Sequence, residues 1–155
     1  MTLDVGAVTS GAKLAVTREK LEYRQGSPSV VVKKFITQEN VQLDVIGMEW
    51  NVRNLAIALG AGVTSATDSL ETLEIGGSMQ VDQYAARFVH VTPAGETVSI
   101  YLYTVEAAGA LEVAFGEGPH EFPMSMTALE TLTDWAGNTL AATKRLMKIH
   151  YAKMA

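Results

Sequence analysis

The chain has 155 residues, of which 48 % are apolar and 19 % are charged, and its formal net charge is −5. A chain of this size can bury a sizeable core, and we expect one domain spanning 1–155. The absence of cysteine excludes disulfides, thiolate metal sites and a cysteine nucleophile. No apolar run approaches the ~20 residues of a membrane helix, and the first residues lack the pattern of a secretory signal. We therefore expect a soluble protein made in the cytoplasm, without membrane insertion.

The charges are unevenly divided along the chain. Residues 1–34 carry six basic and three acidic side chains, residues 35–143 carry two basic and fourteen acidic ones, and residues 144–155 carry four basic ones. A chain with basic ends and an acidic middle can attract copies of itself through surfaces of opposite sign. The alternative is that both signs are scattered over the folded surface and solvated.

The first part of the chain predicts strands. Residues 1–11 are small and polar and are typical of an arm or a loosely held first strand. Apolar side chains then alternate with polar ones at 13–17, 20–24 and 38–46, and 30–36 is rich in β-branched residues, so four strands are expected. The apolar phase moves to odd positions at Leu21 and Tyr23, which predicts a bulge or turn near 17–19. The residues 25–28, Gln-Gly-Ser-Pro, supply turn chemistry.

One short helix follows, at about 51–59. Its apolar stripe at i, i+3, i+4 and i+7 consists of Val52, Leu55, Ala56 and Leu59. Asn51 can act as N-cap, and Gly60 suits the left-handed position after the last turn. We expect Trp50, Leu55 and Leu59 to anchor this helix to a sheet.

The remainder returns to strand patterns after an aperiodic stretch. Residues 61–77 are interpreted as a long loop, which holds a short strand at 70–75 or orders only against a partner. Strands are expected at 79–92, 97–106, 111–115, 122–126 and 145–151. The strand at 97–106 is apolar in both phases, which predicts a central position or a cover from another subunit. The turn at 93–96 predicts a hairpin, and Pro123 favours an edge position for its strand.

These patterns together predict a mainly β fold. We expect an antiparallel β-sandwich or partial barrel of about nine strands, flanked by the short α-helix at about 51–59.

Patterns typical of catalysis or cofactor binding are weak. The histidines at 90, 120 and 150 lack metal-ligand spacing, and the glycines do not form a phosphate-binding motif. Asp44 and Glu49 are near each other in sequence but occupy positions where acids are ordinary. No nucleophile-elbow motif is present. We therefore expect neither enzymatic activity nor a metal or cofactor.

Several segments resemble one known family. They are 18–23 (REKLEY), 25–28 (QGSP), 49–51 (EWN), 54–60 (NLAIALG) and the closing part at 127–151. These segments are similar to the major tail (tail tube) proteins of long-tailed bacteriophages. The resemblance implies a β-sandwich with one flanking helix, hexameric rings whose inner sheets join into a barrel, and rings stacked into a tube. It also implies a virion location after assembly in the cytoplasm of a bacterial host.

The resemblance implies partners as well. They are further copies of the chain, the tape-measure protein inside the tube, the tail terminator, and tail-tip or baseplate proteins, while DNA passes through the lumen without specific binding. We expect Glu39 and Asp44 to contribute to an acidic lumen that repels phosphates. We expect Lys33 and Lys34 to meet the acidic surface of an adjacent ring, so that reversing their charge impairs tube growth.

Other functions remain open from the sequence. The chain is also compatible with a tube subunit of a contractile tail or injector. A carbohydrate- or ligand-binding sandwich is a different class, with an aromatic platform made of Trp50, Trp135, Tyr101 and Tyr103. The weakest alternative is a hydrolase that uses dispersed acids with His90 or His150.

Overall fold

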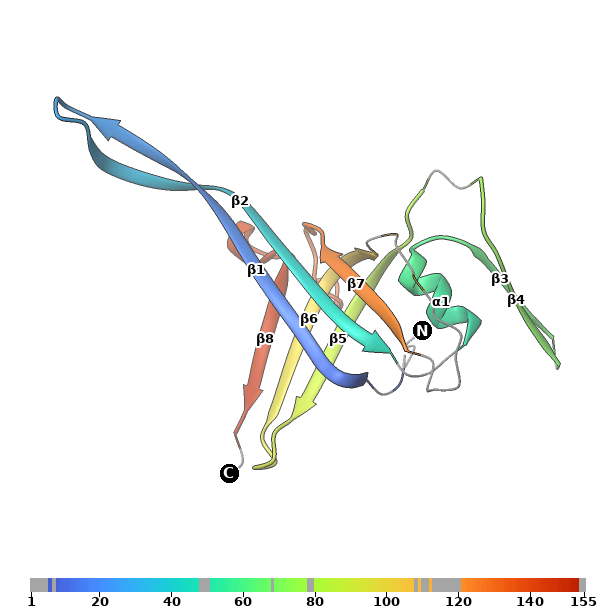
Figure 1. Cartoon of the computed structure of the whole chain (residues 1–155). Coiled ribbons are helices and arrows are strands. Elements are labelled where there is room, and N and C mark those ends of the chain that lie inside the picture. Colours follow the sequence, from blue (N-terminus) through green and yellow to red (C-terminus); the bar gives the residue numbers. More distant parts are fainter. Residues whose placement is uncertain are drawn as a thin grey trace.

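The computed structural model describes residues 6, 8–47, 51–67, 69–77, 80–107, 109, 112 and 121–153 (Figure 1). The elements in chain order are β1 (Val8–Gln25), β2 (Val30–Gly47), α1 (Val52–Leu59), β3 (Val63–Thr67), β4 (Leu70–Glu74), β5 (Gln83–Val91), β6 (Thr97–Ala107), β7 (Phe122–Ala128), the 3-10 turn η1 (Ala142–Lys144) and β8 (Met147–Ala152). The prediction of a mainly β fold with one short helix is confirmed.

Six strands form one antiparallel sheet that curls into a half-barrel (Figure 1). Their order is β1-β2-β7-β6-β5, and β8 pairs with β6. One edge of β6 pairs with β5, while the other pairs with β8 over Thr97–Leu102 and with β7 over Val105–Ala107. The central position expected for 97–106 is therefore confirmed. Of the two predicted architectures, the partial barrel is the one observed, because the other sheet is only the pair β3-β4.

The core forms where β2, β6 and β7 turn alternate side chains toward one another and toward α1. Its buried members are Val41, Leu43, Val45, Ala58, Ile100, Leu102, Val105, Phe122, Met124, Met126 and Ala128. Gly47 closes one end of this cluster, since a Cβ there would lie 2.6 Å from Cζ of Phe122. Only glycine allows the aromatic ring to lie so close to the β2 backbone.

The helix begins and ends as its sequence predicts. Asn51 is extended and its Oδ1 accepts a hydrogen bond from the backbone N–H of Asn54 at 2.7 Å. Gly60 has φ of +68°, and its N–H donates to the carbonyls of Ala56 and Ile57. Both caps satisfy backbone groups that an eight-residue helix otherwise leaves unpaired.

Two of the expected strand breaks are not present. The segments 13–17 and 20–24 belong to one 18-residue strand, β1, and 30–36 and 38–46 belong to another, β2. The predicted irregularity exists, because the register shifts between Glu19 and Lys20. The extra residue lies on β2, where Thr37 has no residue of β1 paired with it. Of the predicted bulge or turn, the bulge is observed, and because a bulge allows a strand to continue, the pairing persists through it.

The prediction of a long loop at 61–77 is wrong. Residues 63–74 form the hairpin β3-β4, in which the strand expected near 70–75 is β4. Small residues and threonines hid the alternation of β3, which has few apolar side chains. The expected arm at 1–11 is shorter, since β1 begins at Val8, and residues 1–5 and 7 lie outside the described part.

The later strands differ in detail from the prediction. The strand expected at 79–92 is β5, and the turn at 93–96 joins it to β6 as predicted. The segment expected at 111–115 lies outside the described residues, apart from residue 112. β7 lies between β2 and β6 rather than at an edge. Its described ladder with β6 stops at Met126, so Pro123 still sits where that side of β7 makes no described pairing.

Candidate interaction surface

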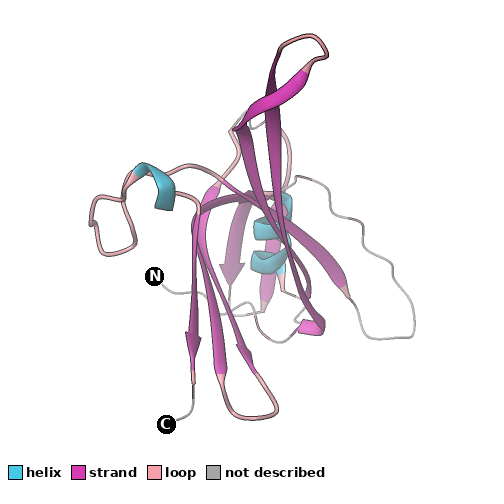
Figure 2. Cartoon of the chain, turned by 90° about the vertical axis from the view of Figure 1, so that its left-hand side faces the viewer, coloured by secondary structure: helices cyan, strands magenta, loops and turns pink. Residues whose placement is uncertain are grey.

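A hairpin of exposed residues extends well beyond the half-barrel. β1 and β2 remain paired over nearly their whole length. Residues 30–39 of β2 are all exposed, whereas Val41, Leu43 and Val45 are buried in the body. Figures 1 and 2 show the ribbon leaving the sheet and standing free. We call residues 17–39 the distal hairpin.

One face of the distal hairpin is apolar. Residues directly opposite each other in an antiparallel pair share a face, and Leu21 is opposite Phe35, Tyr23 opposite Lys33, and Gln25 opposite Val30. We call the face formed by Leu21, Tyr23, Val30, Lys33 and Phe35 the apolar hairpin face. Leu21 is 61 % exposed, Val30 59 % and Phe35 47 %. Adjacent exposed side chains of this size are characteristic of interaction surfaces.

This apolar face points away from the side that continues into the core. In the body, Leu14 of β1 is opposite the buried Leu43, so the even positions of β1 face the core. The pairing skips Thr37 and Val32, both on β2, while β1 continues without an extra residue. Odd-numbered Leu21 and Tyr23 therefore lie on the opposite side of the same strand. The large apolar side chains Leu21, Tyr23 and Phe35 of the distal half therefore face away from the chain's own core and are exposed.

The other face of the distal hairpin carries an ion-pair network, beside the apolar side chains of Val31 and Ile36. Glu22 binds Lys34 at 2.6 Å and Arg24 at 2.8 Å. The hydrogen bond from Lys34, followed by that from Arg24, lowers the pKa of the exposed Glu22 carboxyl. Lys33 and Lys34, the expected ring-stacking residues, thus lie on opposite faces. Lys34 belongs to this ion-pair network, while Nζ of Lys33 lies 4.8 Å from the centre of the Phe35 ring.

The two expected lumen acids also have different surroundings. Glu39 follows the phase of the core-facing residues and forms an ion pair with Arg18, with Oε1 2.5 Å from Nε. Asp44 lies in the opposite phase, on the outer face of the sheet. Because β2 alternates regularly between 38 and 47, the two carboxylates project from opposite faces of that strand.

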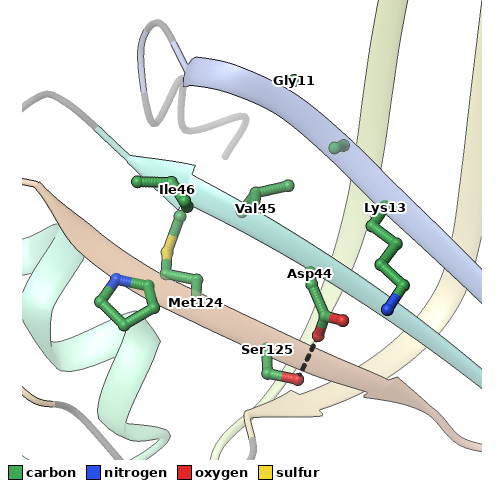
Figure 3. A pocket seen from close by; sticks show the side chains of 9 residues that line it. Gly11, Lys13, Asp44, Val45, Ile46, Met124 and Ser125 are labelled. Carbon is green, nitrogen blue, oxygen red and sulfur yellow. Dashed lines mark hydrogen bonds between the residues drawn. The ribbon is translucent and has the colours of Figure 1, made fainter.

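Asp44 lies at the centre of a polar row across β1, β2 and β7 (Figure 3). Its Oδ1 accepts hydrogen bonds from Oγ of Ser125 at 2.6 Å and from Nε2 of Gln42 at 2.8 Å. These bonds, the one from Ser125 above all, lower the pKa of the Asp44 carboxyl. Lys13 lies directly opposite on β1, beside a shallow hollow of about 360 Å³. The row is a polar sheet face on which the Asp44 carboxylate lies opposite the Lys13 side chain.

Two of the three expected helix anchors, Leu55 and Leu59, lie within the described residues. Leu55 packs against the core cluster together with Ile57, while Leu59 is half-buried at the end of α1. Trp50 lies outside the described residues.

The expected aromatic platform is not flat. Tyr101 meets Trp135 at 63° and His150 at 70°, with ring centres 5.2 Å and 5.4 Å apart. The guanidinium of Arg87 lies 5.3 Å from the centre of the Tyr101 ring. Nε1 of Trp135 donates to the carbonyl of Tyr103 at 3.3 Å. The rings thus pack edge to face on each other instead of presenting coplanar faces to a sugar.

Catalytic and metal-binding groupings find little support in the described part of the chain. No three histidine, cysteine, aspartate or glutamate side chains gather there as a metal site. His90 and His150 are exposed on β5 and β8, and His120 is not described. None of the described helices is long and apolar enough to cross a membrane.

No protein-family model matches the chain, and no curated protein matches it.

The sequence contains the signal of the apolar hairpin face, but sequence reasoning did not predict that this face would be exposed. The shift of apolar phase at Leu21 and Tyr23 was interpreted as a sign of a bulge or turn near 17–19, and its effect on which face is covered was not predicted. It marks a strand that is apolar on one face in the body and on the other face beyond it. The exposed apolar side chains of β3-β4, Val63 and Leu70, were missed because their segment was interpreted as a loop.

Proposed function

We propose that this protein is a structural subunit that assembles with copies of itself into stacked rings, as the tail tube proteins of long-tailed bacteriophages do. The observation that carries the proposal is the distal hairpin, whose apolar face is exposed on a ribbon extending beyond the body. An isolated two-stranded ribbon is marginal in water, and a long one with large exposed apolar side chains is a hazard unless a partner covers it.

The open edges of the half-barrel support ring formation. Within the described residues, β1 and β5 each pair on one side only. Unpaired strand edges are templates for pairing with another chain, and joining them around a ring removes them. Hexameric symmetry is what the family resemblance implies for such a ring.

The polar outer face is the surface we assign to the lumen. The Asp44 carboxylate remains charged because Ser125 and Gln42 hydrogen-bond to it. The Asp44 carboxylate repels phosphates, and the Ser125 hydroxyl and the Gln42 amide already donate hydrogen bonds within the row, so few donors are left to hold passing DNA. Glu39 takes no part in this assignment, because it faces the other way and is paired with Arg18. The tape-measure protein, tail terminator and tip proteins remain the partners proposed by resemblance.

The experiment is negative-stain electron microscopy of the purified protein over a range of concentrations and salt. Rings or tubes of uniform diameter are expected, and analytical ultracentrifugation should show a concentration threshold for their formation. A monodisperse monomer under all these conditions would contradict the proposal. Whether the tail is contractile is decided by the presence of a sheath protein in the particle.

A further inference from the structure

A second exposed hairpin lies on the other side of the body. β3 and β4 pair so that Val63 is opposite Glu74 and Thr67 is opposite Leu70, which puts all four on one face. Val63 is 68 % exposed and Leu70 61 %. Ala66 and Glu71 lie on the other face, where they border a groove beside the start of α1. We call the face with Val63, Thr67, Leu70 and Glu74 the acceptor face.

The acceptor face and the apolar hairpin face match in two properties. Each combines large exposed apolar side chains with one charged residue, Glu74 on the first and Lys33 on the second. Neither Glu74 nor Lys33 takes part in an ion pair among the described residues.

The charge surrounding each face has the corresponding sign. Residues 18–34 carry five basic and two acidic side chains. Residues 54–86 contain no lysine, arginine or histidine, and their acids are Asp68, Glu71, Glu74 and Asp82. Surfaces of opposite sign attract each other and disfavour contacts between like surfaces.

The two hairpins lie on opposite sides of the molecule (Figure 1). A contact between two different surfaces on opposite sides of a subunit joins copies head to tail, and it repeats indefinitely unless the rotation between copies closes a ring. We propose that the acceptor face of one copy receives the apolar hairpin face of the next, with Glu74 against Lys33. This inference rests on the proposed function and adds to it the surface that receives the distal hairpin.

Crosslinking tests the contact directly, because a chain without cysteine allows single introduced thiols. Gln25→Cys places a thiol on the apolar hairpin face and Thr67→Cys places one on the acceptor face, with both charges left in place. A mixture of the two variants, one carrying a size tag, should form a mixed dimer with a short bismaleimide. Lys144→Cys, exposed on η1, is the control partner for Gln25→Cys. Equal crosslinking to both partners would overturn the inference, whether or not tubes form.

Charge exchange tests the role of the pair. Lys33→Glu and Glu74→Lys should each raise the concentration needed for assembly by about tenfold, and the chain carrying both should recover, as expected when one favourable charge contact is lost and restored. Glu71→Lys changes the charge of β3-β4 equally but on the other face, so its effect should be smaller. Normal assembly of Glu74→Lys together with failure of Lys33→Glu would refute the acceptor face and leave the proposed function standing. Failure of the wild type to assemble would refute the proposed function itself.

Discussion

The sharpest prediction concerns the apolar hairpin face. Leu21→Thr together with Phe35→Thr removes a cross-strand pair from that face while preserving β propensity. Complete burial of a leucine or phenylalanine side chain contributes about 1.5–3 kcal/mol. The two side chains are 61 % and 47 % exposed, so covering the remaining area contributes about 1 kcal/mol each, or about 2 kcal/mol per docked hairpin. Each 1.4 kcal/mol is tenfold, so the dissociation constant should rise about 30-fold.

The assay is the threshold concentration for assembly, measured by sedimentation and light scattering. The thermal midpoint of the unassembled variant should stay close to that of the wild type, since neither side chain contributes to the core. Val31→Thr together with Ile36→Thr is the matched control, because both residues lie on the other face of the same hairpin. An unchanged threshold for the first variant, or an equal rise for the control, would refute the reasoning.

Three further predictions concern the body of the molecule. Hydrogen bonds from Ser125 and Gln42 lower the pKa of Asp44, so the stability that its carboxylate contributes is present above the ordinary pKa and is lost as pH falls through the lowered one. The thermal midpoint of Asp44→Asn should therefore fall less than that of the wild type between about pH 5 and pH 2. Gly47→Ala should lower the free energy of unfolding by about 1–3 kcal/mol in urea titrations, and adding Phe122→Leu should recover part of this if the clash is the cause. Asn51→Ala should lower it by about 1 kcal/mol through loss of the N-cap, and an unchanged urea midpoint would argue against that cap.

Local features of the chain were predictable from the sequence because they depend on neighbouring residues. The helix at Val52–Leu59 follows from its apolar stripe, with Asn51 and Gly60 as caps. The turns after Gln25 and Val91 follow from glycine and proline chemistry. The central position of β6 follows from its two apolar faces.

Longer-range features were less accessible. Whether two short patterns form one strand depends on pairing with a partner, and a bulge at Thr37 lets β1 and β2 continue where alternation on β1 alone indicates a break. The strand β3 lacks an apolar signal, so only its pairing with β4 identifies it. The opposite orientation of Lys33 and Lys34 was implicit in their adjacency, but their different partners required the folded ribbon.

The sequence by itself determined which segments alternate, where the helix is capped, and that basic and acidic side chains are concentrated in different parts of the chain. The tertiary structure decided which of the alternating faces are covered. Leu14 and Leu21 belong to the same strand and have similar patterns, yet one packs against the core and the other is exposed. The physical reason is that burial depends on which distant strands and helices cover a face, and neighbouring residues alone do not specify that.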